Sequence, residues 1–174
     1  MTFPPEIAIR VGILTVSDRS SAGTRPDESG PALAGVITTR GWKVVQRKTV
    51  PDDADDIRST LSAWSDSQEI DLILTTGGTG FSPRDITPEA TLRVIDRQAP
   101  GLAEAMRSAS LRVTPHAMLS RAVAGIRKRT LIVNLPGSPK AAVENLDVIM
   151  PVLPHAFQLL KEDPRSEAGH KAVS

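Results

Sequence analysis

Small and acidic residues follow several apolar runs of this sequence, in positions where they could bind a phosphorylated ligand. Residues 76–80 read Thr-Gly-Gly-Thr-Gly. Glycine lets backbone N–H groups turn towards an anion, and a threonine hydroxyl adds a further donor. The same segment could equally be a tight turn that needs glycine only for positive φ angles. It is neither a P-loop nor a Gly-x-Gly-x-x-Gly fingerprint, so alone it does not decide between these interpretations.

Two aspartates, Asp52 and Asp85, are candidates for holding a cation. Mg²⁺ is bound in proteins through one or two carboxylates together with phosphate oxygens of the substrate. Each aspartate also has a simpler explanation. Asp52, or its neighbour Asp53, could cap the helix expected to follow, and Asp85 could stabilise a turn or pair with Arg84. The cation hypothesis therefore depends on both carboxylates reaching one place.

Two further polar segments could contribute to the same site. Residues 134–138 read Asn-Leu-Pro-Gly-Ser, where Ser138 could cap a helix whose free N–H groups attract anions, or simply begin an ordinary helix. Ser17 and Asp18 could hydrogen-bond a ribose or a heterocycle, or form a plain loop. No nucleophile–base pair is recognisable. Any catalysis is therefore expected to depend on positioning and electrostatics.

The scaffold for these segments is predicted from apolar patterning. β-Branched apolar runs predict strands at 7–16, 43–50, 71–76 and 130–135. Caps, prolines and helical spacing predict helices at 29–40, about 53–64, from 87 onwards, 102–111, 141–150 and 151–160. This alternation predicts a single α/β domain over 7–161 with a mostly parallel sheet. Residues 1–6 would form an extension and 162–174 a polar tail. The loops after the strands should meet at one edge of the sheet.

Composition excludes several other classes. The 174 residues include no cysteine, which rules out disulfides and thiolate chemistry. A net charge of +1, with three Phe, two Trp and no Tyr, argues against nucleic acid as a partner. No apolar run approaches the roughly 20 residues of a membrane span, and no secretory signal is recognisable at the start. We expect a cytoplasmic protein without membrane contact.

Seven blocks in order give the sequence a family resemblance. They are Leu-Thr-Val-Ser-Asp (14–18), Asp-Glu-Ser-Gly (27–30), Val-Pro-Asp (50–52), Leu-Thr-Thr-Gly-Gly-Thr-Gly-Phe (74–81), Pro-Arg-Asp-Ile-Thr-Pro-Glu-Ala (83–90), Met-Leu-Ser-Arg (118–121) and Asn-Leu-Pro-Gly-Ser (134–138). Over about residues 7–160 the chain resembles the MogA/MoaB family of molybdenum-cofactor biosynthesis, which includes the gephyrin G domain.

The resemblance implies a fold, a reaction and a set of site residues. It implies a three-layer α/β/α sandwich, a homotrimer, and transfer of AMP from ATP to molybdopterin with Mg²⁺. Asp52 and Asp85 would be the essential catalytic and metal-binding residues. The nucleotide would contact Ser17, Asp18, Thr76, Gly77, Gly78, Thr79, Gly80, Asn134, Pro136, Gly137 and Ser138. The pterin side would contact Ser110 and Ser120, and we expect the adjacent Arg121 to help bind phosphate.

Alternatives remain within and beyond this family. A MoaB-type relative could bind molybdopterin or nucleotide without catalysing transfer, because a fold does not fix an activity. A scaffold or assembly protein is a second alternative, and a related domain from molybdotransferase or competence-damage proteins is a third, although both normally occur in longer chains. A molybdotransferase is also a candidate protein partner.

Overall fold

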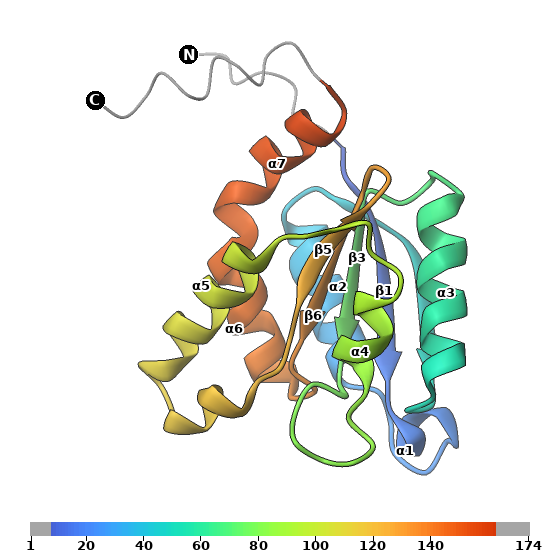
Figure 1. Cartoon of the computed structure of the whole chain (residues 1–174), viewed down its shortest axis with the longest axis vertical. Helices are drawn as coiled ribbons and strands as arrows, with labels where there is room; N and C mark the ends of the chain where they lie inside the picture. The colour runs from blue at the N-terminus through green and yellow to red at the C-terminus, as the bar shows by residue number, and fades with distance from the viewer. Residues whose placement is uncertain (1–7, 163–174) are drawn as a thin grey trace.

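The computed structural model describes residues 8–162 and shows a central sheet between two layers of helices (Figure 1). The strands are β1 (Arg10–Val16), β2 (Lys43–Val50), β3 (Leu72–Thr76), β4 (Arg97–Gln98), β5 (Ala124–Arg127) and β6 (Thr130–Leu135). The α-helices are α1 (Asp18–Ser21), α2 (Ser29–Thr39), α3 (Ala54–Asp66), α4 (Thr87–Leu92), α5 (Pro100–Leu111), α6 (Pro139–Ile149) and α7 (Leu153–Leu160). Two short 3₁₀ helices are η1 (Pro115–Leu119) and η2 (Met150–Val152).

The sheet is mostly parallel, as predicted. Its six strands run in the order β2-β1-β3-β6-β5-β4. Strands β2, β1, β3 and β6 are parallel, β5 is antiparallel to β6, and β4 is antiparallel to β5. The register aligns the carboxyl ends of the parallel strands: Thr15 pairs with Thr76, and Thr76 pairs with Leu135. The loops that follow these strands therefore leave the sheet at the same height.

Alternate residues of the strands feed two separate cores, which is why the strands are apolar on both faces. Val11 and Ile13 of β1 pack towards α2, α5, α6 and α7 in one core. Leu14 and Val16 of the same strand pack towards α3 and α4 in the other. In Figure 1, α3 and the pair α5 and α6 accordingly lie on opposite sides of the sheet. The three-layer α/β/α prediction is confirmed.

The sequence missed the antiparallel edge of the sheet. No strand was expected between residues 77 and 129, yet β5 pairs with β6, and the two-residue β4 pairs with β5. These strands are too short to show the alternation that reveals longer ones. Lys128, in the turn between β5 and β6, has a φ of 52°, an uncommon backbone conformation for a residue other than glycine.

Element ends differ from the predictions by a few residues. The strand predicted over 7–16 begins at Arg10, and its first predicted residue lies outside the described part of the chain. The helices predicted from 102 and from 141 begin at Pro100 and Pro139, because proline is well tolerated in the first helical turn. The predicted extension 1–6 and all of the predicted tail except Glu162 lie outside the described residues. Within residues 8–162, no helix combines the length and apolarity needed to cross a membrane.

Candidate active site

The loops after β1, β3 and β6 surround a pocket of about 380 Å³ at the carboxyl edge of the sheet. Five residues predicted to contact a nucleotide line it: Ser17, Thr76, Gly77, Gly137 and Ser138. The start of α2 forms another side. The predicted convergence of these three loops is therefore present in the structure.

The glycine loop after β3 is a tight turn that fits closely against its neighbours. Gly77 and Gly78 have φ angles of 102° and 65°, which side-chain-bearing residues rarely adopt. A methyl group on Gly77 would lie 2.2 Å from the carbonyl oxygen of Val16. The Gly77 N–H donates to the carbonyl of Leu135 (3.2 Å), so this N–H is already committed within the fold. The tight-turn interpretation therefore holds at Gly77, while the following residues bring the loop beside the aspartates.

Asp52 and Asp85 both lie against this glycine loop. A methyl group on Gly78 would lie 3.2 Å from Oδ1 of Asp52, and one on Gly80 would lie 2.9 Å from Oδ2 of Asp85. Glycine at both positions therefore leaves room for the two carboxylates. Oδ2 of Asp85 also accepts a hydrogen bond from the N–H of Ser82 at 3.0 Å, inside the same loop.

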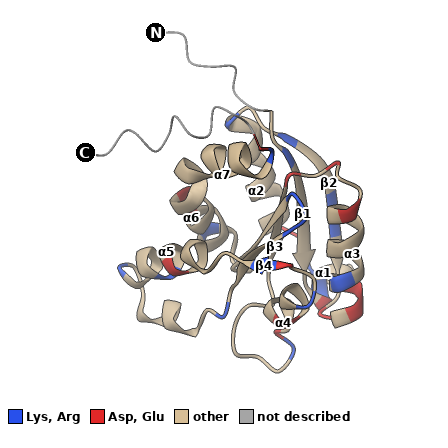
Figure 2. Ribbon diagram, turned by 45° about the horizontal axis from the view of Figure 1, so that its top comes forward, with Lys and Arg blue, Asp and Glu red and all other residues tan. Residues whose placement is uncertain are grey.

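Asp18 and Asp52 tie the loop after β1 to the loop after β2. The N–H of Asp18 donates to Oδ2 of Asp52 (2.8 Å), and the N–H of Asp52 donates to Oδ1 of Asp18 (3.0 Å). Arg84 then bridges from the loop after β3, donating to both carboxylate oxygens of Asp18 at 3.0 and 2.7 Å. Charged residues of both signs gather along the ribbon of α1 and the beginning of α3 (Figure 2). The loops after three neighbouring strands are thus joined at this acidic corner, which we define as Asp18, Asp52 and Asp85.

The pKa values of Asp52 and Asp18 are shifted in opposite directions. Burial raises the pKa of Asp52, and the negative charges of Asp18 and Asp85 raise it further, against the N–H of Asp18, which lowers it. Hydrogen bonding from Arg84 lowers the pKa of Asp18. Asp52 therefore carries a charge that its surroundings do not neutralise, and a cation placed beside it would be stabilised.

The donor set at this corner suits Mg²⁺ in combination with a phosphorylated substrate. Asp52 and Asp85 offer hard carboxylate oxygens, and Mg²⁺ is commonly held by one or two of these plus phosphate oxygens. No group of three or more His, Asp or Glu side chains within residues 8–162 is placed to hold a metal by itself. The remaining ligands would have to come from the substrates and water.

Asp53, and not Asp52, caps α3. Its carboxylate accepts from the N–H groups of Asp55 (2.9 Å) and Asp56 (3.1 Å). The sequence had left open which of the two neighbours performs this role. Because Asp53 takes it, Asp52 has no capping role.

Asn134 does not fit its predicted role as a nucleotide ligand. Its side chain is fully buried, and its Nδ2 donates to the hydroxyls of Thr75 and Thr91, both at 2.9 Å. Its Oδ1 accepts from the N–H of Val123 at 3.2 Å. A buried amide with these partners has no free group directed at a ligand, so Asn134 joins β6 to β3 and α4. Pro136, also predicted as a contact, accepts a hydrogen bond from Thr76 Oγ1 through its carbonyl (2.7 Å).

Arg121, which we expected to help bind phosphate, bonds the segment after β3. Its guanidinium donates to the carbonyls of Gly80 (2.7 Å) and Asp85 and to the carboxylate of Glu89. These protein groups take three of its five N–H donors, so Arg121 has a structural role here, and phosphate binding by Arg121 stays a prediction. Ser120 Oγ accepts from the N–H of Ala122 at 3.4 Å.

Ser110 lies away from the glycine loop, on α5. Its hydroxyl accepts a hydrogen bond from Nδ2 of Asn145 on α6 at 3.2 Å. Neither Ser110 nor Ser120 lines the pocket at the carboxyl edge of the sheet. The structure therefore does not bring the two predicted pterin contacts into that pocket, and their role stays a prediction.

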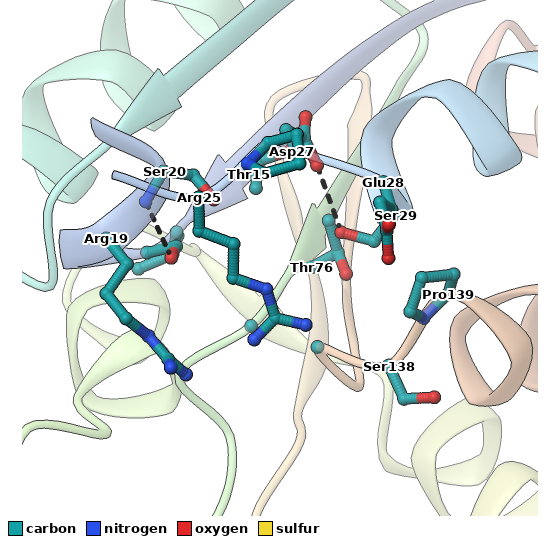
Figure 3. A pocket seen from close by; sticks show the side chains of 15 residues that line it. Thr15, Arg19, Ser20, Arg25, Asp27, Glu28, Ser29, Thr76, Ser138 and Pro139 are labelled. Carbon is teal, nitrogen blue, oxygen red and sulfur yellow. Dashed lines mark hydrogen bonds between the residues drawn. The ribbon is translucent and has the colours of Figure 1, made fainter. Parts of the chain in front are cut away.

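Sequence reasoning missed two arginines at the pocket. Arg19 and Arg25 line it, and Figure 3 shows both side chains reaching over it opposite Ser138. Neither guanidinium has an ion-pair partner within residues 8–162. Arg19 lies in the four-residue helix α1 and Arg25 in the irregular segment after it, and neither stretch is long enough to show a periodic pattern. That both arginines line the pocket depends on how this part of the chain folds back.

Asp27 belongs to one of the family blocks, but no role was predicted for it. In the structure it lines the pocket, and its hydrogen bonds hold one wall together. Its carboxylate accepts from Thr15 Oγ1 (2.8 Å), from Ser29 Oγ (3.3 Å) and from the N–H of Gly30 (3.0 Å). It thereby bonds a free N–H in the first turn of α2, where the side chain of Glu28, at the N-cap position, makes no such bond. The signal available in the sequence was an aspartate three residues before a glycine at a helix start.

These features define a class of protein: an open α/β sheet with a polar pocket and an acidic corner at the carboxyl edge of its central strands, where such folds bind ligands. The family model described as "Probable molybdopterin binding domain" matches residues 12–155. The chain therefore belongs to the MogA/MoaB family of molybdenum-cofactor biosynthesis proteins, as the sequence blocks predicted.

Named relatives agree with this assignment. The chain is 42% identical over 154 residues to the molybdopterin adenylyltransferase of Helicobacter pylori strain J99, covering 87% of this chain and 88% of the relative. It is 39% identical over 180 residues to the molybdopterin adenylyltransferase of Escherichia coli K12, covering 95% and 92%. Gephyrin from Dictyostelium discoideum is 45% identical over an alignment of 166 positions, covering 90% of this chain and 23% of gephyrin. The chain thus spans about a quarter of that longer relative.

Solved structures share the fold. The molybdopterin biosynthesis enzyme MoaB from Thermus thermophilus superimposes with a TM-score of 0.84 at 52% identity, covering 90% of this chain and 98% of the other. The molybdopterin biosynthesis Mog protein from Mycobacterium ulcerans gives a TM-score of 0.83 at 40% identity, covering 90% and 99%.

Proposed function

We propose that this chain transfers AMP from ATP to the terminal phosphate of molybdopterin and releases pyrophosphate. In this reaction an oxygen of the molybdopterin phosphate forms a bond to the α-phosphorus of ATP. The bond from that phosphorus to the oxygen bridging to the β-phosphate breaks, and pyrophosphate leaves with the electron pair. Curated relatives named molybdopterin adenylyltransferase, matched over most of their length, support this assignment.

The observation that carries the proposal is that Asp52 and Asp85 both lie against the glycine loop, whose first glycine, Gly77, lines the pocket. Two polyanions must approach each other in this reaction, and they repel unless positive charge lies between them. A Mg²⁺ ion held by Asp52 and Asp85 would supply that charge and polarise the phosphate oxygens. Because no residue pair forms a recognisable nucleophile and base, binding and orientation account for the catalysis.

The remaining pocket residues bind and orient the reactants. Arg19 and Arg25, which have no ion-pair partner among the described residues, hold phosphate groups at the pocket. Ser17, Ser138 and Thr76 present hydroxyl groups to the nucleotide, although the Thr76 hydroxyl also donates to the carbonyl of Pro136. Arg84 keeps the loops after β1 and β3 together by its paired hydrogen bonds to Asp18.

The cellular setting is also a proposal. We infer a cytoplasmic homotrimer that passes adenylylated molybdopterin to a molybdotransferase. In gephyrin and in the Drosophila melanogaster protein cinnamon, the matched region is 23% and 26% of a longer chain, so this domain occurs next to others. That arrangement supports a protein partner acting on the product.

A direct test mixes the purified chain with ATP, Mg²⁺ and molybdopterin and measures pyrophosphate release. We expect release that requires all three components and that is lost in the Asp85→Asn variant with its fold retained. A wild-type protein that binds molybdopterin but releases no pyrophosphate would be the non-catalytic MoaB-type alternative. Wild-type turnover in Asp85→Asn would show that the cation assignment is wrong.

A further inference from the structure

We propose that Arg121 is a positioning residue. It holds the segment 79–89 in the shape that places Asp85 beside the other two carboxylates of the acidic corner. This proposal rests on the proposed function for its catalytic consequence. It gives Arg121 a role that needs no contact with either reactant and that acts through the backbone that carries Asp85.

Four contacts join Arg121 to this segment. Its backbone N–H donates to the carbonyl of Thr79 at 2.9 Å, and its Nε donates to the carbonyl of Gly80 at 2.7 Å. Its two terminal nitrogens donate to the carbonyl of Asp85 and to the carboxylate of Glu89. We call these four contacts the Arg121 clamp.

The clamp closes the loop at both ends. The carbonyls of Gly80 and Asp85 stand five residues apart in sequence, and one planar guanidinium bonds both. Between them the loop has its own bonds: the N–H of Ser82 donates to Oδ2 of Asp85 (3.0 Å), and the N–H of Asp85 donates to the carbonyl of Ser82 (2.8 Å). The position of the Asp85 carboxylate is thus fixed from within the loop, and the position of the loop is fixed by Arg121.

The chemistry of this contact requires arginine. A guanidinium has five N–H donors in a rigid fork, whereas a lysine ammonium is a single point of charge and does not span two carbonyls and a carboxylate in this geometry. The guanidinium bonds the main-chain carbonyl of Asp85, which leaves the carboxylate available to a cation. The Arg121 side chain is also one-third exposed, so its partners, more than burial, define its role.

The test compares Arg121→Lys with Arg127→Lys. Arg127 is a matched control because it also bonds a carboxylate, that of Asp66 (3.1 and 2.9 Å), and a carbonyl, that of Val94 (3.0 Å). It does so at the opposite end of β5 from the segment that carries Arg121. Hydrogen exchange of the ligand-free proteins reports the loop itself, through the amides of Ser82 and Asp85. The pyrophosphate assay reports kcat and KM for ATP, and a magnesium titration reports the concentration that gives half-maximal activity.

We expect Arg121→Lys to speed exchange of the Ser82 and Asp85 amides by about tenfold while β3 stays protected. We expect kcat to fall by about 10- to 100-fold, since a misplacement near 1 Å has that effect. KM for ATP should stay within about twofold, and more Mg²⁺ should be needed. Arg127→Lys should change none of these values.

Other outcomes would overturn the clamp. Unchanged exchange in Arg121→Lys would do so, as would a uniform loss of protection and activity that Arg127→Lys reproduces. If Arg121→Lys does not fold, Glu89→Gln loosens the clamp from its exposed end, and unchanged exchange there would overturn it too. A wild-type protein without pyrophosphate release would refute the proposed function, while the exchange comparison would still decide the clamp.

Discussion

Asp52 and Asp53 are neighbours in the chain, but their surroundings give them different roles. Asp53 is exposed and bonds the first N–H groups of α3, whereas Asp52 is half-buried and exchanges hydrogen bonds with Asp18. Burial and the nearby carboxylates raise the pKa of Asp52. At the scale of single residues, the site is therefore defined by which of the two neighbouring carboxylates is not used to cap a helix.

This contrast predicts a separation of activity from stability. Asp52→Asn should remove adenylylation and leave the free energy of unfolding within about 0.5 kcal/mol, because the amide oxygen can still accept from Asp18. Asp53→Ala should lower the free energy of unfolding by about 1 kcal/mol through loss of the cap and leave kcat unchanged. Pyrophosphate release and urea unfolding check both variants. A reversed pattern would exchange the roles given to the two residues.

At the scale of elements, the site depends on how strand ends are tied to the helices beside them. Asn134 bonds Thr75 of β3 and Thr91 of α4 from inside the sheet, and Thr87 Oγ1 donates to the carbonyl of Gly77 at 2.9 Å. These bonds place α4 against the glycine loop. They also explain why a family block contains an asparagine that does not face the pocket.

Asn134→Ala tests this structural role. Removal of the amide leaves the buried N–H of Val123 without its side-chain acceptor and the two threonine hydroxyls without a donor. We expect the free energy of unfolding to fall by about 2–3 kcal/mol. The affinity of the folded protein for ATP should change less than about threefold, measured by calorimetry well below the melting temperature. A large loss of affinity with unchanged stability would restore Asn134 as a ligand.

At the scale of the whole molecule, a second polar cluster closes the sheet at the end opposite the site. Asp71, just before β3, is buried and accepts from the N–H of Arg10 at 2.9 Å and from its guanidinium at 3.1 Å. Lys161, after α7, reaches the same carboxylate at 3.2 Å. Burial opposes ionisation of Asp71, but the hydrogen bonds from Arg10 outweigh it and keep its pKa below the ordinary value of 3.8.

This cluster predicts an acid-dependent loss of stability. Because the pKa of Asp71 is lower in the folded chain than in the unfolded chain, the stabilisation is complete above about pH 5. It is lost as the pH falls below 3.8 and through the folded-state pKa. Asp71→Asn should lower the free energy of unfolding by about 2 kcal/mol at pH 7, and this difference should shrink below about pH 4.

Urea unfolding at several pH values measures this effect. The control is Asp55→Asn, whose carboxylate is 85% exposed in an ion pair with Arg58. It should change stability little at any pH, because exposed ion pairs contribute little. A difference between wild type and Asp71→Asn that does not depend on pH would show that the carboxylate charge is not what stabilises this end of the sheet.

The sequence by itself determined the layered α/β fold, the parallel strands and the loops that meet at their ends. These follow from local signals, because a strand buried on both faces is apolar throughout and a helix start is marked by caps and proline. Asp52, Asp85 and the glycine loop were identified in the same way, with the family blocks placing them at one site.

Which polar side chains remain available to a ligand depends on the tertiary structure. The Asn134 side chain, predicted as a ligand, is occupied by partners that lie 11 to 59 residues away in sequence. Three donors of Arg121 are used by partners 32 to 41 residues away. Arg19, in the short helix α1, and Arg25, in the irregular segment after it, both line the pocket. Hydrogen-bond partners that distant in sequence leave no periodic signal. Whether a side chain is available to a ligand is therefore decided only when the chain folds and brings these partners into contact.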